Sequence, residues 1–400
     1  MSRVLLISLD IVGKAMAGPA IRYFEFAKAL SLKHKVVLMT PNTPDIEPTR
    51  FRFAPHTAMR EEICRADVVV CQQLKPNMAL WLSLAAPRLI IDAYDPEPLE
   101  HLEIFKNSSL KERHKRNRDI VSKTLFSLAS ADGILYANES QRDLWMGLLM
   151  GQGAVTPERY DEDSTLSHFL AKVPFGLPEE PLLPKTGMRQ KFGLKKEDFV
   201  LLWGGGIWNW FDPLTLIRAL SFMPDVKLVF MGIKHPNDQI PEMAMTKQAY
   251  NLSKELSLLD TQVFFNFDWT PYEERQAFLY EANIGVSTHF NHLETRYAFR
   301  TRLLDYLWAG LPIVTTCGDS MGDFIERERA GISVPFQSPD AIVRAIGKIR
   351  ENPKPYRENS RSLSKAFTWP KVIEPLEAMI ERLSSKKAKG IAFSRMWACL

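Results

Sequence analysis

The chain has 400 residues, 46% of them hydrophobic, which is long enough for two domains that each bury a core. Its formal net charge of +4 is too small to indicate a nucleic acid partner. Its four cysteines form no C-x-x-C pair, so the sequence indicates neither a zinc site nor a disulfide framework, and this usage favours a reducing, cytoplasmic compartment. No apolar stretch approaches about 18 residues, and no membrane span is predicted.

The first part of the chain alternates short apolar runs with helical or loop segments. This alternation predicts a doubly wound parallel sheet, in which ligands bind beyond the carboxyl ends of the strands. The predicted strands are residues 4–9, 36–40, 66–72, 89–94 and 133–137.

A loop with two glycines joins the first predicted strand to a helix that begins near Pro19. Gly13 and Gly18 allow close approach of the backbone, and a loop in this place commonly cradles an anion. A simple connecting loop is the alternative, because the spacing is not that of a dinucleotide fingerprint. Arg22 is expected to project from the first turn of the helix.

Asp95 follows the predicted strand 89–94, at the edge where ligands bind in such sheets. We therefore treat it as a candidate functional acid. The alternative is a turn-forming aspartate ahead of Pro96.

Residues 106–123 carry seven Lys or Arg against Glu112 and Asp119. On a helix, this charge could attract anionic lipid or a lipid-linked diphosphate acceptor. A solvated basic face is the alternative.

Prolines cluster between residues 174 and 184, and a charged stretch follows at 195–198, which indicates a linker. A second parallel sheet is predicted beyond it. Its strands are residues 199–203, 226–231, 263–267, 284–288, 313–316 and 331–334.

Three glycines follow the first strand of this second sheet directly. The backbone N–H groups of Gly205 and Gly206 can reach a phosphate there, and Trp208 can pack on a base or a sugar. Core packing is the alternative for the tryptophan. Asp212 is expected to cap the next helix, with Pro213 in its first turn.

Residues 292–314 combine an apolar helix face with charges on another face, and the helix is predicted to end at Gly310. Arginines at a helix start indicate a phosphate site, and a carboxylate one turn further indicates ribose hydroxyls. A nucleoside diphosphate would satisfy both, whereas a solvated salt-bridge face is the alternative. The residues concerned are Arg296, Arg300, Arg302 and Asp305.

Glu294 follows the predicted strand 284–288 and precedes these arginines. It is expected to face a ligand at the carboxyl edge of the sheet, because a lone buried carboxylate is costly.

The segment resembles the donor-site signature of retaining glycosyltransferases of the GT-B fold, glycosyltransferase family 4. In that family, a carboxylate five residues before a Gly-Leu-Pro turn binds the donor ribose, and a basic residue three positions earlier meets the phosphates. Asp305 and Arg302 hold these positions ahead of Gly310. Tyr297 stands where the family's other glutamate would be, and Glu294 is the nearest acid.

The resemblance implies two Rossmann-like domains that face each other across a cleft. Residues 1–180 would bind the acceptor, residues 181–370 would bind the nucleotide-sugar, and a C-terminal helix in residues 371–400 would cross back to the first domain. The expected reaction is sugar transfer from a nucleotide-diphospho-sugar with retention of configuration, with no metal or other cofactor. Glu294 and Asp95 are the expected catalytic acids.

The acceptor is expected to be a glycan, a lipid-linked glycan or a small molecule, and peripheral contact with an anionic membrane is part of the same expectation. Two alternatives stay open. One is a nucleotide-sugar epimerase of the same fold, and the other is a non-catalytic partner subunit that keeps the fold without the chemistry.

Overall fold

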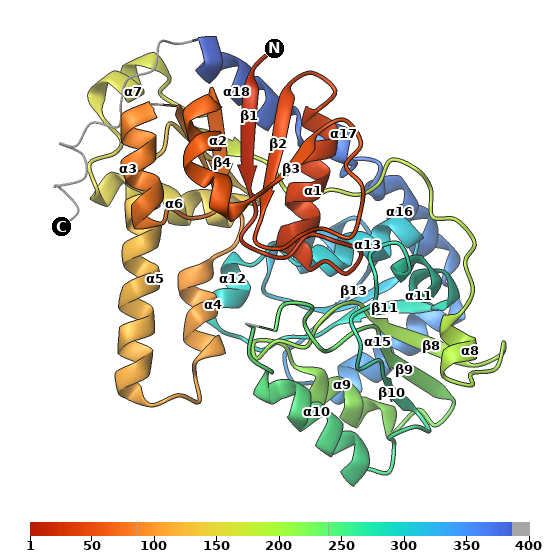
Figure 1. The fold of residues 1–400 in the computed structure, drawn as a ribbon. Coiled ribbons are helices and arrows are strands. Elements are labelled where there is room, and N and C mark those ends of the chain that lie inside the picture. The colour runs from red at the N-terminus through yellow and green to blue at the C-terminus, as the bar shows by residue number, and fades with distance from the viewer. Residues whose placement is uncertain (86, 239, 386–400) are drawn as a thin grey trace. The chain divides into compact units, whose positions relative to one another are not determined.

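The computed structural model describes residues 1–85, 87–238 and 240–385 (Figure 1). The chain divides into two compact units. Unit 1 comprises Met1–Phe175 and the C-terminal segment from Trp369, and unit 2 comprises Gly176–Thr368.

Unit 1 is built on a seven-stranded parallel sheet of order β3-β2-β1-β4-β5-β6-β7. Its strands are β1 (Arg3–Ile7), β2 (Lys35–Thr40), β3 (Arg52–Pro55), β4 (Val68–Cys71), β5 (Arg88–Asp92), β6 (Gly133–Tyr136) and β7 (Leu170–Lys172). Its helices are α1 (Gly18–Leu30), η1 (His56–Ala58), α2 (Met59–Arg65), α3 (Pro76–Ala85), α4 (Glu97–Ile104), α5 (Leu110–Ser130), α6 (Glu139–Gly151), α7 (Pro157–Glu162), α17 (Trp369–Val372) and α18 (Glu374–Ser385).

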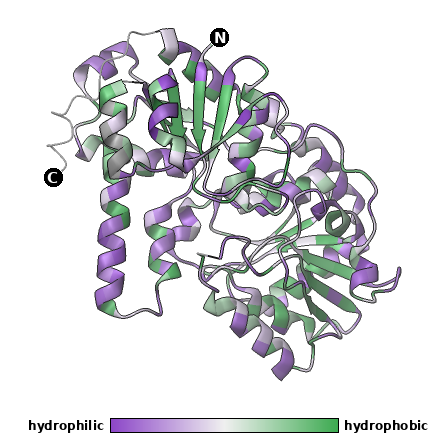
Figure 2. Ribbon diagram, in the orientation of Figure 1, coloured by the Kyte–Doolittle hydropathy of each residue, from purple (hydrophilic) through white to green (hydrophobic). Residues whose placement is uncertain are grey.

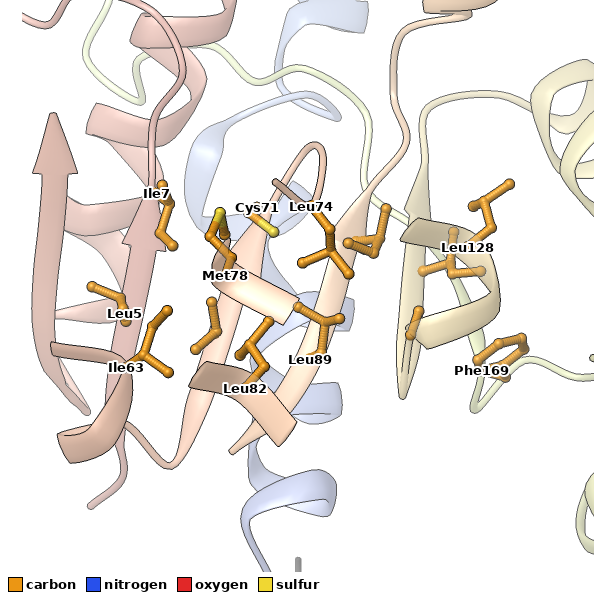
Figure 3. Packing of buried hydrophobic residues seen from close by; sticks show 14 of the residues in the cluster. Leu5, Ile7, Ile63, Cys71, Leu74, Met78, Leu82, Leu89, Leu128 and Phe169 are labelled. Carbon is orange, nitrogen blue, oxygen red and sulfur yellow. The ribbon is translucent and has the colours of Figure 1, made fainter. Parts of the chain in front are cut away.

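The central strands of unit 1 are buried on both faces, as their unbroken apolar runs predict. On one face, Leu5 and Leu89 from the sheet pack with Ile63 of α2 and with Met78 and Leu82 of α3 (Figure 3). This core holds the carboxyl ends of β1, β4 and β5 in fixed positions.

The C-terminal helices belong to unit 1, which confirms the expected return of the chain to its first domain. Helix α17 contacts α1, and α18 contacts β4 and β7. Trp369 is buried, with ring centroids 5.9 Å from Phe26 and 5.0 Å from Phe175. Met379 packs so closely on Gly133 that a Cβ there would lie 2.3 Å from its sulfur, so β6 needs a glycine at this point.

Helices α4 and α5 form a hairpin that extends beyond the sheet of unit 1 (Figure 1). The buried residues of α5 all lie in its second half, from Ile120 to Leu128. Figure 2 shows that its first half is hydrophilic. Within the part of the chain that the structure describes, no helix is long and apolar enough to cross a membrane.

Unit 2 is built on a six-stranded parallel sheet of order β10-β9-β8-β11-β12-β13. Its strands are β8 (Phe199–Trp203), β9 (Val226–Phe230), β10 (Val263–Phe265), β11 (Ile284–Ser287), β12 (Ile313–Thr316) and β13 (Gly331–Val334). Its helices are α8 (Met188–Lys191), α9 (Pro213–Leu220), α10 (Ala244–Glu255), α11 (Arg275–Glu281), α12 (Leu293–Tyr297), α13 (Thr301–Ala309), α14 (Ser320–Arg327), α15 (Pro339–Glu351) and α16 (Lys354–Ser364).

In unit 2 the strand order reverses between β8 and β11, which are neighbours in the sheet but not in the sequence. Connections leave two adjacent strands in opposite directions at such a switch point, and ligands bind there, beyond the carboxyl ends of the strands. A ligand site is therefore expected at the loops that follow β8 and β11.

All strands predicted from the sequence are present, and several end one or two residues earlier than expected. The short strands β3 and β7 were not predicted. The expected single helix within residues 292–314 is two helices, α12 and α13, separated at Ala298–Arg300. Gly310 ends α13 in the left-handed conformation, with φ 64° and ψ 31°, as predicted.

Candidate functional site

The loops after β8 and β11 are fastened to each other. The backbone N–H of Asp212 donates to the carbonyl of Thr288 (2.9 Å), and the Thr288 hydroxyl donates to the carbonyl of Asp212 (2.7 Å). Asp212 also caps α9, accepting from the Thr215 N–H at 3.0 Å. The two loops therefore form one rigid edge at the switch point of the sheet.

The side chain of Tyr306 in α13 holds the glycine loop, residues 204–206, in place. Its ring is fully buried, and its hydroxyl accepts a hydrogen bond from the Gly204 N–H at 2.7 Å. The same oxygen lies 2.9 Å from the carbonyl oxygens of both Leu202 and Val286. A Cβ on Gly285 would lie 2.3 Å from this ring, so β11 must carry a glycine there. One side chain thus joins β8, β11 and the glycine loop.

Arg302 lies directly beside the glycine loop. Its Nη2 donates to the Gly206 carbonyl at 2.8 Å, and its guanidinium lies 4.0 Å above the Phe211 ring. Nη1 is buried without a hydrogen-bond partner, and Arg302 forms no ion pair with a carboxylate of the described residues. Burial lowers the pKa of Arg302 to about 10, and repulsion from Arg300 adds to this effect. A cation in such surroundings is electrostatically prepared for an anion.

Arg300 and Glu294 do not lie as the sequence led us to expect. Both are buried, and Arg300 donates from Nη1 and Nη2 to the two carboxylate oxygens of Glu294, each at 2.8 Å. The Nε of Arg300 lies 3.5 Å from Asp319 Oδ2. The premise that Glu294 could not be buried was wrong, because its charge is paired and hydrogen-bonded there. The guanidinium of Arg300, expected at a phosphate, holds these two carboxylates instead.

His289 and Asp319 complete this buried group. His289 Nε2 lies 3.5 Å from Asp319 Oδ2 and 3.2 Å from the carbonyl of Cys317. Burial raises the pKa of Asp319 to about 6, against the attraction of Arg300. Burial, with repulsion from Arg300, lowers the pKa of His289 well below its ordinary value. His289 is therefore a neutral group that fixes the loop after β11.

The two other charged residues predicted on this edge, Asp305 and Arg296, are more exposed than Arg300 and Glu294. Asp305 has a 27% exposed side chain, and its Oδ1 lies 3.4 Å from Arg275 Nε. Burial raises its pKa, and Arg275 opposes that shift. Arg296 is exposed, 5.6 Å from the Tyr297 ring centre. Asp305 thus keeps a carboxylate oxygen for a ligand, whereas Arg296 lies on the open surface.

A pocket of about 360 Å³ lies next to Gly206 in unit 2. Aromatic rings form much of its wall, including Trp208, Trp269, His235 and Phe267. Trp208 also stacks on Trp210, with ring centroids 5.1 Å apart and planes at 4°. Gly205 adopts φ 83°, a left-handed conformation that favours glycine. The volume and the flat apolar walls suit a planar ring system.

Unit 1 buries Arg22, which was expected to project from α1. Its guanidinium donates to both carboxylate oxygens of Asp92 at 2.8 Å, and it lies 4.5 Å from the ring centres of both Phe26 and Tyr94. It also donates to the carbonyls of Val173 and Pro174 (2.8 and 2.9 Å). Arg22 therefore fastens α1 to the sheet and is not available to a ligand.

Asp95 lies at the carboxyl end of β5, as predicted, in a pocket of about 20 Å³ that it shares with Glu97. That volume holds about one water molecule. Burial raises the pKa of Asp95 to about 7, with a hydrogen bond from Tyr94 opposing the shift and repulsion from Glu97 adding to it. Burial also raises the pKa of Glu97 to about 7, although its carboxylate accepts from Gln73.

The loop after β1 donates several of its N–H groups to the protein itself. Val12 donates to the Asn42 side chain at 3.0 Å, and Lys14 donates to Asp45 at 2.7 Å. These amides are not free to cradle an anion. Gly18 begins α1, and a Cβ there would meet nothing within 4 Å. Of the two loops predicted to bind an anion, the loop after β8 is therefore the better candidate.

Residues 185–366 match the model of the family Glycosyl transferases group 1. No curated protein sequence matches the chain.

Residues 185–366 are therefore similar to a group 1 glycosyl transferase domain.

Three solved structures resemble the whole chain. HepE from Anabaena, in complex with UDP and glucose, has 11% sequence identity and a TM-score of 0.66, over 96% of this chain and all of the other. Sucrose-phosphate synthase from Thermosynechococcus elongatus has 16% identity and a TM-score of 0.64, with full coverage of both chains. WaaG, a glycosyltransferase involved in lipopolysaccharide biosynthesis, has 16% identity and a TM-score of 0.62, over 94% of this chain and 98% of the other. Both units are Rossmann-like, and the chain has the GT-B fold.

The region that matches this family, residues 185–366, contains the whole of the edge between β8 and β11. The structure places Arg302 and Trp208 beside Gly206 there. Sequence reasoning missed Tyr306, Asp319 and His289. Tyr306 follows Asp305 directly on an apolar helix face, and only the fold shows that its hydroxyl reaches Gly204.

We predict that Asp95→Asn raises the free energy of unfolding at pH 8 by about 4 kcal/mol, as an order of magnitude from its raised pKa. In the wild type, the folded state keeps the Asp95 proton up to about pH 7, whereas the unfolded state loses it near pH 4. Stability supplied by this proton is therefore present below pH 4 and is lost as the pH rises toward 7. In urea unfolding from pH 4 to 8, the free energy of unfolding should decrease less with pH for the variant than for the wild type.

The exposed residue Asp161 provides a matched control for this test. Asp161→Asn should leave the pH dependence of stability unchanged. Equal pH profiles for Asp95→Asn and wild type would show that Asp95 titrates normally.

Proposed function

We propose that the chain is a glycosyltransferase that moves a sugar from a nucleoside diphosphate sugar to an acceptor. The observation that carries this proposal is Arg302, a cation without a carboxylate partner, fixed beside Gly205 and Gly206 at the switch point of the group 1 domain. When the leaving nucleoside diphosphate departs, negative charge develops at its phosphates. A preorganised cation and backbone N–H groups stabilise that charge.

The aromatic pocket beside Gly206 is the proposed place of the base. Its walls at Trp208 and Trp269 can stack on a planar ring. Gly206 lines the pocket and also accepts a hydrogen bond from Arg302, so a ligand with its base in the pocket can place its diphosphate beside Arg302. Asp305, with one carboxylate oxygen partly exposed, is the proposed partner of the ribose hydroxyls. UDP is the proposed nucleotide, since HepE is in complex with UDP and glucose and another similar structure, from E. coli, is bound with UDP-2-fluoro glucose.

Retention of configuration is the proposed stereochemical course, on the resemblance to family 4. Transfer is proposed to need no metal, because Arg302 and the glycine loop supply the positive charge that a cation would otherwise provide. Glu294 acts in this proposal as a positioning residue, through Arg300. Asp95 is the proposed acid–base group on the acceptor side, because a pKa of about 7 suits proton transfer at neutral pH.

Calorimetry with UDP, GDP and dTDP, followed by transfer assays with the matching sugar nucleotides, tests this proposal. We expect one nucleotide to bind with micromolar affinity and its sugar to be transferred to a glycan or lipid-linked acceptor, with retention seen in the NMR spectrum of the product. Sugar conversion without an acceptor would indicate an epimerase. Nucleotide binding without any turnover would indicate a non-catalytic subunit.

The α4–α5 hairpin is the proposed contact with an anionic membrane or a lipid-linked acceptor. Residues 106–123 carry seven Lys or Arg, and Leu110, at the tip, is 66% exposed. Basic charge together with an exposed apolar side chain suits a lipid interface.

We predict that Lys111→Gln with Lys115→Gln weakens binding to phosphatidylglycerol vesicles about thirtyfold, because each lysine near an anionic surface contributes about 1 kcal/mol. Vesicle sedimentation at low and high salt measures this, and the difference should shrink as salt screens the charges. The matched control is Lys247→Gln with Lys254→Gln, two exposed lysines of α10. If both double variants bind alike, the hairpin does not contact the membrane.

A further inference from the structure

A histidine and two glutamates lie together where the last helix packs on unit 1. His34 lies in the connection between α1 and β2, and Glu377 and Glu381 are one turn apart on α18. One ligand atom from each residue lies within 4.8 Å of the others. In the described part of the chain, this is the one group of three His, Cys, Asp or Glu residues with such spacing.

His34 is the decisive member of this group. Its side chain is buried, with 4% of the residue exposed, and neither ring nitrogen has a hydrogen-bond partner. Buried polar atoms are rarely left without a partner, so an imidazole of this kind indicates a ligand that the protein chain does not itself provide.

We propose that His34, Glu377 and Glu381 bind one Zn²⁺ ion and thereby fasten α18 to unit 1. One imidazole nitrogen and two carboxylate oxygens are ligands that Zn²⁺ accepts, and the exposed position of Glu381 leaves room for water as the fourth ligand. Calcium and magnesium prefer oxygen ligands alone, so the histidine favours a transition metal.

The spacing of the three residues is close to what zinc needs. Zinc–nitrogen and zinc–oxygen bonds of about 2.0–2.2 Å place tetrahedral ligand atoms about 3.4 Å apart. The observed limit of 4.8 Å is wider, and rotation of the two glutamate side chains, which share one face of α18, can close the difference.

Lys33 competes with the metal for one of these ligands. Its ammonium lies 2.7 Å from Glu377 Oε1, and its side chain is 65% exposed. A zinc ion must displace it, and an exposed lysine can turn into solvent at little cost. Removal of this lysine should therefore strengthen zinc binding, which is the opposite of what removal of a ligand does.

Within unit 1, the site lies at the edge of the sheet opposite to the one that carries Asp95. His34 directly precedes β2, so it lies at the amino ends of the parallel strands, whereas ligands bind beyond the carboxyl ends. The ion would act on stability, through α18, and not on sugar transfer. The inference therefore does not depend on the proposed function, and its test needs no substrate.

Calorimetric titration of the chelator-treated full chain with ZnCl₂ is the test. We expect one equivalent to bind and to raise the melting temperature, because an ion that binds only the folded state stabilises it. His34→Gln and Glu381→Gln should each weaken this binding at least tenfold. Lys33→Gln should strengthen it, and Glu374→Gln, an exposed glutamate on the same helix, should leave it unchanged.

Glu381 is exposed, so Glu381→Gln tests the site even if a change at buried His34 prevents folding. Absence of zinc binding to the wild type would overturn the proposal. So would equal affinities for wild type, His34→Gln and Glu381→Gln, which would place the ion elsewhere, for instance on the exposed Cys64.

Discussion

Glu294→Gln is expected to lower the free energy of unfolding of unit 2 by about 3–5 kcal/mol, as is usual when one partner of a buried ion pair is removed. Two bonds of 2.8 Å join Glu294 to Arg300, and both side chains are at most 4% exposed. The glutamine can accept only one of these bonds. Arg300 would then keep a buried positive charge that Asp319, 3.5 Å away, offsets only in part.

A double-mutant cycle in urea measures this coupling. Arg300→Gln should destabilise by a similar amount. The variant with both changes should lose less than the sum, since it removes both charges of the pair and leaves only Asp319 without its contact to Arg300. The exposed pair Glu112–Arg116 provides the control, with 38% and 50% exposed side chains, and Glu112→Gln should cost less than about 0.5 kcal/mol.

Transfer assays on the same variants separate two roles for Glu294. If the glutamate acts by positioning Arg300 and the loop after β11, activity should fall together with stability. A normal free energy of unfolding with transfer slowed at least tenfold would contradict the positioning role. It would restore the expectation from the sequence that Glu294 contacts the donor sugar.

The sheets and their switch points could be predicted because they depend on local patterns. Unbroken apolar runs mark the buried strands, and the caps at Asp212 and Gly310 are set by residue type and by near neighbours. Strand β7 was missed because its three residues are too few for a pattern to show. The break at Ala298–Arg300 carries neither glycine nor proline, so nothing in the sequence separates α12 from α13 there.

The candidate site was predictable in its backbone and less so in its charges. Glycines after a buried strand indicate an anion loop wherever they occur, and Gly205 and Gly206 lie where that rule places them. The state of an arginine depends on partners distant in sequence, as with Arg22 and Asp92, which are 70 residues apart. Helical spacing alone cannot distinguish such a buried ion pair from a cation without a carboxylate partner. Arg300 and Arg302 are two positions apart and have opposite surroundings.

That contrast makes Arg302→Ala the sharpest test of the donor site. The change should weaken binding of the nucleoside diphosphate by about 10- to 100-fold, since a hydrogen bond to a charged group contributes about 1.5–3 kcal/mol. The folded chain should lose little stability. The side chain donates one hydrogen bond, to the Gly206 carbonyl, and packs on Phe211. Its Nη1 is buried without a hydrogen-bond partner, so removal of the charge also removes an unfavourable contribution to stability.

Arg302→Gln distinguishes charge from hydrogen bonding, because the glutamine amide can still donate to Gly206 but carries no charge. If the phosphates are held by charge, both variants should bind UDP equally weakly in calorimetry, at unchanged melting temperature. Arg327→Ala, at a side chain that is 67% exposed on α14, should bind as the wild type does. An unchanged dissociation constant for Arg302→Ala would show that Arg302 of α13 does not bind the phosphates. The buried charge of Arg302 would then have no ligand to explain it, since nothing in the described chain neutralises it.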